Sequence, residues 1–156
     1  MQLHEAKELA IQLMNQHGLL DLNWYFEFDN AKRRFGICNY RYKKIGLSKH
    51  LVLLNDEARV KNTILHEIAH ALVGFNHGHD SIWRMKAMEI GCDGERCYSS
   101  AEVVRPKGKY TAICPNPKCK HEFIKHKAPR GKQSCGVCNV VRRFNPDTIL
   151  TWIANY

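Results

Sequence analysis

Apolar residues recur at the spacing of an α-helix in three parts of the chain. The predicted helices cover residues 3–17, a stretch from Asn55 or Asp56 to about Val73, and residues 81–90. A glycine directly follows each segment, and glycine commonly ends a helix. Asn55 and Asp56 both have the short polar side chain that caps a helix N-terminus. The middle helix is therefore predicted with a defined beginning and end.

Three shorter segments have the composition of β-strands. They are "WYFEF" at 24–28, "RFGICNY" at 34–40 and "IGLS" at 45–48. The run "DNAK" at 29–32 is typical of a turn, so we expect the second strand to return beside the first in a small antiparallel sheet. Together with the predicted helices, these strands indicate an α+β fold.

Charge divides the chain into two parts near "RPKGK" at 105–109. Residues 1–104 contain 13 Lys+Arg and 13 Asp+Glu and are neutral overall. Residues 105–156 contain 11 and 2, so the whole net charge of +9 lies in the last third of the chain (11 − 2 = 9). This uneven distribution favours two domains with different roles, residues 1–104 and residues 105–156.

The C-terminal run "NPDTILTWIANY" at 145–156 has features of a helix. Asn145 can cap the helix, and Pro146 suits its first turn. Ile149 and Ile153 are four positions apart and would share one helical face. We therefore expect a C-terminal helix that docks through this face.

Composition limits the kind of protein. A chain of 156 residues, 44% of them hydrophobic, can form one ordinary domain or a small domain with a metal-stabilised module. The N-terminus has charged residues where a signal peptide has its apolar core, and no apolar run is long enough to span a bilayer. We therefore expect an intracellular protein, cytoplasmic or nuclear, with no membrane partner. In a reducing compartment the seven cysteines are expected to be metal ligands or free thiols.

Four histidines lie close together in "LHEIAHALVGFNHGHDSIW" at 65–83. His66 and His70 are four positions apart on the predicted middle helix, so their imidazoles project from one face and can share a zinc ion. Glu67 completes the motif H-E-x-x-H, in which a carboxylate takes a proton from water activated by the metal. The motif therefore predicts hydrolytic chemistry at a zinc site.

A catalytic zinc site needs a third protein ligand and one open position. His77 and His79 both follow the predicted end of the helix, and spacing alone does not choose between them. The alternative is that His66 and His70 are hydrogen-bonded core residues of a buried helix. Two observations favour the metal site. A third histidine ligand lies nearby in the sequence, and burying an unpaired charge at Glu67 would be costly.

The run "ILHEIAHAL" followed by "HDSIW" resembles the SprT-like family of zinc metallopeptidases, which includes the Spartan-type proteases of DNA–protein crosslinks. In that family a histidine with Trp or Phe four positions later is the third ligand, and His79 with Trp83 has this spacing. The resemblance implies a zincin-like fold, Glu67 as the general base, and a supporting or gating role for His77. The ligands that it implies for the catalytic zinc are His66, His70 and His79.

Four cysteines in the last third predict a second zinc site. "CPNPKC" at 114–119 and "CGVC" at 135–138 give two pairs that are separated by 15 residues, as in a zinc ribbon. The predicted ligands of this structural zinc are Cys114, Cys119, Cys135 and Cys138. A site with His121 or His126 in place of Cys119 is one alternative, and disulfides are a less favoured one. The cysteines expected to remain free thiols are Cys38, Cys92 and Cys97.

Basic and aromatic residues are interleaved in residues 105–156. Cations bind phosphates and aromatic rings stack on unpaired bases, so a basic zinc ribbon beside a neutral domain favours nucleic-acid binding. The alternative is an exposed basic surface that only keeps the protein soluble. No base-reading motif is visible, so we expect binding of single-stranded or duplex DNA without sequence specificity. The predicted contact residues are Lys118, Lys120, Lys125, Lys127, Arg130, Lys132, Arg142 and Arg143.

These features together predict a monomeric zinc metallopeptidase with one catalytic and one structural zinc, which cleaves proteins bound or crosslinked to DNA. The substrate class comes from the family resemblance, because the spacing by itself predicts only a hydrolytic zinc site. One alternative is a non-catalytic DNA-binding or regulatory protein with a zinc ribbon and a purely structural three-histidine site. A zinc hydrolase of another substrate is the second alternative.

Overall fold

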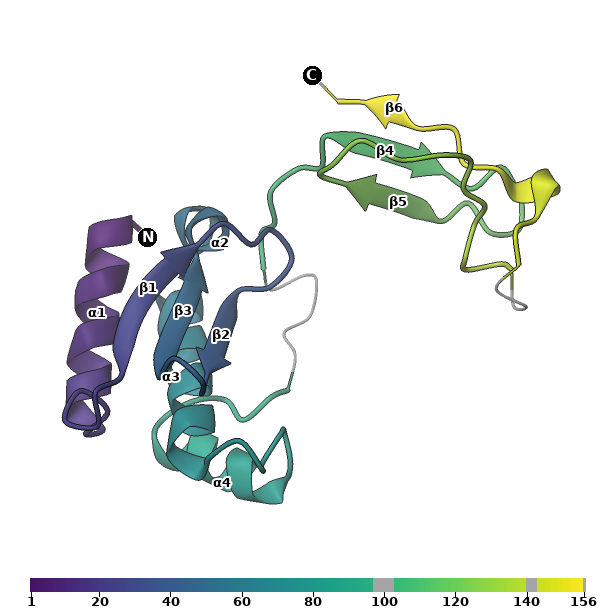
Figure 1. Cartoon of the computed structure of the whole chain (residues 1–156). Coiled ribbons are helices and arrows are strands. Elements are labelled where there is room, and N and C mark those ends of the chain that lie inside the picture. The colour runs from purple at the N-terminus through teal and green to yellow at the C-terminus, as the bar shows by residue number, and fades with distance from the viewer. Residues whose placement is uncertain (97–102, 140–142, 156) are drawn as a thin grey trace. The chain divides into compact units, whose positions relative to one another are not determined.

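A computed structural model describes residues 1–96, 103–139 and 143–155 of the chain. The chain forms two compact units, Met1–Pro106 and Lys107–Tyr156 (Figure 1). The sequence-based boundary at 104/105 lies two residues before this division. Helices and a small sheet make up the first unit and a second small sheet lies in the other unit, so the fold class is α+β as predicted. None of the described helices is long and apolar enough to cross a membrane.

The helices of the first unit lie close to their predicted positions. They are α1 (Leu3–Gln16), α2 (Lys49–Leu54), α3 (Glu57–Val73) and α4 (Ser81–Glu89). Asp56 caps α3, because its side chain accepts a hydrogen bond from the backbone N–H of Arg59 at 2.8 Å. Gly74 ends α3 with a φ of 86°, a conformation that suits glycine. The sequence did not predict α2, because six residues are too few to display a helical period.

The sheet of the first unit is mixed rather than antiparallel. Its strands are β1 (Tyr25–Asp29), β2 (Gly36–Asn39) and β3 (Lys44–Ser48), in the order β1-β3-β2. β2 pairs with β3 antiparallel, but β1 pairs with β3 parallel, so the predicted pairing of β1 with β2 was wrong. The physical reason is burial. Residues 45–48 of β3 are all buried, which places β3 in the centre and the half-exposed β1 and β2 at the edges.

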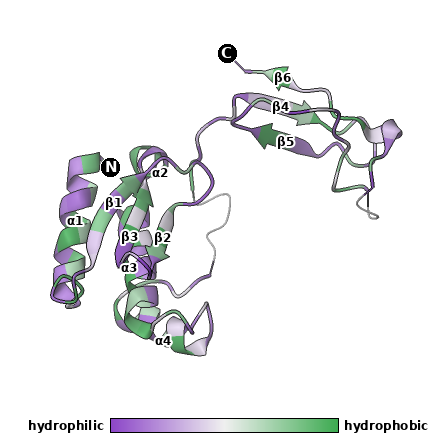
Figure 2. Cartoon of the chain, in the orientation of Figure 1, coloured by the Kyte–Doolittle hydropathy of each residue, from purple (hydrophilic) through white to green (hydrophobic). Residues whose placement is uncertain are grey.

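The core of the first unit lies between the sheet and the helices α1 and α3, which contact each other and the sheet (Figure 1). Hydrophobic residues recur along these elements in Figure 2. Fully buried side chains come from each layer, namely Met14 of α1, Ile45 and Leu47 of β3, and Ile64 and Ile68 of α3. Burial of each such side chain stabilises the fold by roughly 1.5–3 kcal/mol. This core holds α3, and with it the H-E-x-x-H motif, firmly against the sheet.

The second unit is a three-stranded antiparallel sheet with a very small core. Its strands are β4 (Tyr110–Ile113), β5 (Glu122–Lys125) and β6 (Ile153–Ala154), in the order β5-β4-β6. The buried residues of its core are Ala112, Cys114, Cys135 and Leu150. Since two of these four are cysteines, apolar burial alone gives this unit little stability.

The predicted C-terminal helix was wrong. Asn145 and Pro146 do begin a helical turn, but it ends after the short 3-10 helix η1 (Pro146–Thr148). The chain then extends, and β6 pairs with β4. Burial alternates here with a period of two, since Leu150 is buried, Thr151 exposed and Trp152 half-buried. A period of two is typical of a strand, and it overrides the helix-starting signal at residues 145–146.

Candidate active site and metal centres

Three imidazoles converge where α3 meets the loop before α4. His66 and His70 lie one turn apart on α3, and His79 lies just before α4. The Nε2 atom of His79 is 3.0 Å from Nε2 of His66 and 3.1 Å from Nε2 of His70. Tetrahedral zinc with Zn–N bonds of 2.0–2.1 Å requires nitrogen atoms about 3.3 Å apart. The structure therefore brings together the three histidines that the family resemblance implies.

The chemistry of these donors fits a metal cation. A backbone hydrogen bond from Glu95 to the ring of His66, and one from His77 to the ring of His70, hold these imidazoles in place. The Nε2 atoms of both rings face Nε2 of His79. Burial lowers the pKa of His66 and of His70 to about 4, so both rings are neutral at pH 7. Neutral rings with converging nitrogen atoms are what zinc binds.

Trp83 forms the base of the histidine site. Its indole is 1% exposed, and its ring centroid lies 4.6 Å from that of His66, 5.1 Å from that of His70 and 4.6 Å from that of His79. The indole therefore contacts all three imidazoles and restricts their rotation. This contact gives a physical reason for the tryptophan four positions after His79.

Asp80 and His77 support the site from the loop before α4. One carboxylate oxygen of Asp80 caps α4 by accepting a hydrogen bond from the backbone N–H of Trp83 at 2.9 Å. The other lies 2.8 Å from Nδ1 of His77. The His77 side chain is thus held by Asp80, while a hydrogen bond from its backbone orients the ring of His70. His77 lies outside the group of converging nitrogen atoms in the described structure.

Glu67 points from α3 toward β2 and is 8% exposed. Its carboxylate accepts a hydrogen bond from the backbone N–H of Cys38. Burial raises the pKa of Glu67 to about 8, and the positive charge of Arg34 opposes part of this rise. A carboxyl group with a pKa near neutrality can both accept and release a proton under ordinary conditions. The environment of Glu67 thus suits a general base that later acts as an acid.

One cavity of about 470 Å³ joins Glu67 to the three imidazoles. Its walls come from β2, α3 and the loops on either side of α4. Three arginines contribute to the lining, namely Arg34, Arg59 and Arg96. Aromatic side chains also line it, among them Tyr40 and Phe75. The cavity is large enough for a segment of a polypeptide to reach the histidine site.

Several residues of this cavity were not identified from the sequence. The hydroxyl of Tyr40 donates to the carbonyl of His70 at 3.0 Å and also reaches that of Gly74 at 3.3 Å, so it holds the end of α3. Arg96 lies near His79, where its charge adds to burial in lowering the pKa of that ring. Gly36 allows the close approach of Glu67. No local pattern marks these residues, because their importance depends only on where the fold places them.

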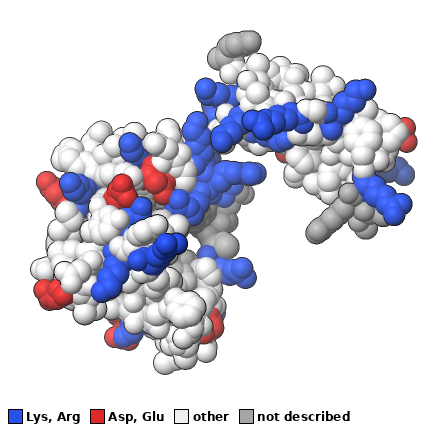
Figure 3. All heavy atoms as spheres, viewed as in Figure 1, with Lys and Arg blue, Asp and Glu red and all other residues white. Residues whose placement is uncertain are grey.

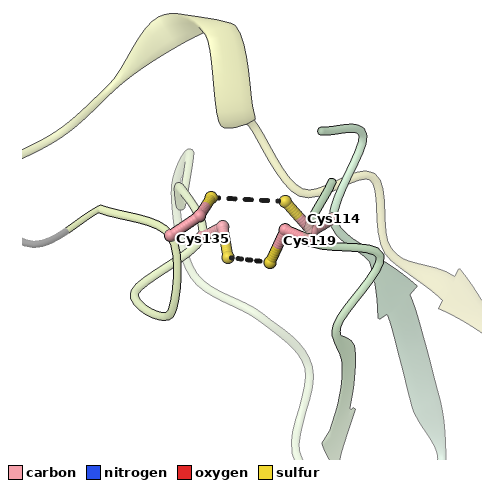
Figure 4. A group of neighbouring side chains, drawn as sticks. Cys114, Cys119 and Cys135 are labelled. Atoms are coloured by element: carbon pink, nitrogen blue, oxygen red, sulfur yellow. Dashed lines mark hydrogen bonds between the residues drawn. The ribbon is translucent and has the colours of Figure 1, made fainter. Parts of the chain in front are cut away.

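The four predicted cysteines of the second unit also come together (Figure 4). The Sγ atoms of Cys114 and Cys138 are 3.6 Å apart, and those of Cys119 and Cys135 are 3.7 Å apart. These distances exclude disulfides and agree with the separation of about 3.8 Å expected for four thiolates around zinc. Cys119 is part of the group, whereas His121 and His126 are not. The donor set therefore fits a four-cysteine zinc site.

The remaining cysteines are placed differently. Cys38 is half-buried on β2, and Cys92 is buried behind α3 with its thiol 3.7 Å from the carbonyl of Asn62. Neither belongs to a metal-binding group among the described residues. Cys97 lies outside the described residues.

Most of the predicted DNA-contact residues are on the surface of the second unit, where Lys and Arg form a band in Figure 3. The exposed ones are Lys118, Lys120, Lys127, Arg130, Lys132 and Arg143. Lys125 is half-buried, and its Nζ lies 4.7 Å from the centre of the Trp152 ring in a cation–π contact. Arg142 lies outside the described residues.

Comparison with known proteins gives one result for the first unit. Residues 5–103 match the model of the SprT-like family, and this match covers more than half of the chain. Searches of curated proteins and of solved structures found no match. The matched region contains the three converging histidines and Glu67. The chain therefore belongs to the SprT-like family.

Proposed function

We propose that this protein is a zinc-dependent peptidase that cleaves proteins bound or crosslinked to DNA. The observation that carries the proposal is the meeting of three imidazole Nε2 atoms and a buried carboxylate in one open cavity. A purely structural zinc site would need the three imidazoles but not Glu67. Burying a carboxylate costs free energy unless a partner compensates for it, so the presence of Glu67 beside the imidazoles favours a catalytic site. Membership of a family of metallopeptidases gives independent support.

His66, His70 and His79 would hold the catalytic zinc. When bound, zinc supplies Lewis acidity, which polarises a carbonyl and lowers the pKa of water from 15.7 toward about 7. Glu67 takes a proton from the attacking water, whose oxygen forms a bond to the scissile carbonyl carbon. The C–N bond then breaks, and Glu67 delivers its proton to the leaving amine. The products are a carboxylic acid and an amine, and Glu67 is ionised again. The new carboxylic acid then loses its proton to solvent.

The second unit would hold the DNA. Its exposed lysines and arginines can bind phosphates, and the four cysteines would hold a structural zinc that keeps this small sheet folded. No sequence preference is expected, because phosphate contacts carry no base information. Binding to DNA would raise the concentration of protein substrates around the peptidase unit.

The experiment compares wild-type protein with Glu67→Gln on a protein crosslinked to DNA, on the same protein free, and on unrelated peptides. We expect wild type to cleave the DNA-bound substrate fastest. Glu67→Gln should lose cleavage and keep both its zinc and its DNA affinity, because the amide retains the shape of the side chain but cannot accept the proton. A wild type with full zinc that cleaves none of the three substrates favours the non-catalytic alternative. Equal cleavage of free and DNA-bound substrates contradicts the substrate class.

A further inference from the structure

Phe75 is the most exposed large hydrophobic residue in the described part of the chain, at 76%. It follows Gly74 at the end of α3 and lines the cavity that contains Glu67 and the histidines. Its ring meets Tyr40 edge-on, with the centroids 6.4 Å apart and an interplanar angle of 71°. An aromatic ring in this position leaves apolar surface in contact with water at the mouth of the cavity.

Tyr40 gives this exposed ring a fixed support. The Tyr40 hydroxyl bonds to the carbonyl of His70, and its ring meets Trp24 edge-on at 6.0 Å between centroids. Trp24 belongs to the core, at 9% exposed. A continuous aromatic path therefore runs from the core to the cavity, and it is bonded to the backbone of a metal-ligating residue. The supporting ring cannot shift without moving the end of α3.

The same cavity has further apolar lining on β2 and just before it. Ile37 is half-buried there, and Phe35 is 1% exposed beneath the cavity wall. The two rings that contact each other on the exposed side are Tyr40 and Phe75, and we call this pair the aromatic subsite. Such a pair gains free energy when an apolar side chain replaces the water against it.

We propose that the aromatic subsite selects polypeptides with a large apolar side chain beside the bond to be cleaved. Hydrophobic side chains of this kind are buried in folded proteins and accessible in unfolded segments. The subsite therefore directs the peptidase toward unfolded or partly unfolded polypeptide. This inference rests on the proposed peptidase function and adds the selection of the substrate to it.

The test uses zinc-loaded full-length protein and peptides that differ only in the residues flanking the cleaved bond. Apolar peptides have Phe and Leu at these positions, and serine peptides have Ser. The measured quantity is the ratio of kcat/KM for apolar peptides to kcat/KM for serine peptides. In Phe75→Ala this ratio should fall about tenfold, because one side of the apolar contact is lost. Phe75→Leu should retain most of the ratio. Tyr42→Ala is the matched control, because Tyr42 is another exposed aromatic residue, at 57%, that does not line the cavity.

A ratio that stays unchanged in Phe75→Ala, or that falls equally in Tyr42→Ala, overturns the inference. Binding without turnover separates this failure from a failure of the peptidase function. Fluorescence anisotropy of labelled peptides added to Glu67→Gln should show that apolar peptides bind more tightly than serine peptides. Adding Phe75→Ala to this variant should reduce that difference in affinity about tenfold. If wild type cleaves nothing but this binding preference depends on Phe75, the peptidase function fails and the subsite stands. If no preference in binding or cleavage depends on Phe75, the subsite is refuted.

Discussion

The carboxylate of Glu67 lies directly against the backbone of Gly36. A Cβ atom at position 36 would be 2.5 Å from Oε1 of Glu67 and 2.9 Å from Cγ2 of Thr63. These separations are too short for any side chain to fit without displacing α3 or the carboxylate. β2 therefore fixes the position of the Glu67 carboxylate, the general base that we propose. It does so because Gly36 has no side chain, and because the backbone N–H of Cys38 donates to the same carboxylate.

Gly36→Ala should impair catalysis without removing the metal ligands. The added methyl group displaces Glu67, so kcat/KM should fall by at least about tenfold, and overpacking should cost roughly 1–3 kcal/mol of unfolding free energy. Enzyme assays and thermal unfolding measure the two effects. Gly78→Ala is the control for overpacking, because no atom beyond its chain neighbours lies within 4 Å of a Cβ built there. Its unfolding free energy should stay close to that of the wild type. Wild-type kcat/KM in Gly36→Ala would show that this contact does not position the base.

The two metal centres should load independently. Elemental analysis of the wild type should give two zinc ions per chain, one from each group of converging ligands. His79→Ala should lose the ion held by the imidazoles, and Cys135→Ser should lose the other. The double variant should then contain none. Two zinc ions in His79→Ala would contradict the assigned third ligand.

Removal of zinc should unfold the second unit and leave the first folded. The second unit has four residues in its buried core, and a structural zinc contributes about 10–16 kcal/mol to the folding of such small modules. The first unit keeps its apolar core without metal. Amide chemical shifts measured by NMR with and without a chelator check this prediction. Persistent dispersion of the amides from residues 107–155 after chelation would refute it.

The thiols of Cys38 and Cys92 should react slowly with iodoacetamide in the folded protein. Burial raises the pKa of Cys38 to about 12, with a contribution from the charge of Glu67, and raises that of Cys92 to about 11. Only the thiolate reacts, so at pH 8 the rate for Cys38 should be on the order of a thousandfold below that of an ordinary cysteine. The rate should rise as the pH approaches the raised pKa. Mass spectrometry measures the rate of modification of each cysteine in native and in denatured protein. Equal rates in the two states would contradict the burial of these thiols.

Binding to DNA should weaken steeply with salt. With about five phosphate contacts, the slope of log K against log salt concentration should be near −3.5 for single strands and −4.5 for duplex. Lys118→Ala should reduce the magnitude of the slope by about 1, because one phosphate contact is lost. Lys61→Ala is the control, because Lys61 lies on α3 of the first unit. Affinity independent of salt would exclude the phosphate contacts.

Local features of this chain were predictable from sequence. The helix α3 was bounded by Asp56 and Gly74, because a capping side chain and a terminating glycine act within one turn. The helical period placed His66 and His70 on one face. The third histidine was not fixed by spacing alone, and His79 was implied by the resemblance to the SprT-like family.

Features that depend on distant contacts were not predictable in this way. The central place of β3 follows from its burial under two helices, which the four letters "IGLS" do not reveal. The C-terminal run contained both a helix-starting signal and a strand period, and pairing with β4 decided between them. Gly36 and Tyr40 acquire their roles only when β2 meets α3.

The position of Trp83 has a practical consequence. An indole in contact with three imidazoles emits light that depends on whether those rings are free, protonated or held by an ion. The other tryptophans lie elsewhere, Trp24 beside Tyr40 and Trp152 beside Lys125. The protein thus has an intrinsic optical reporter at its histidine site, and filling of that site can be followed by fluorescence without any attached dye.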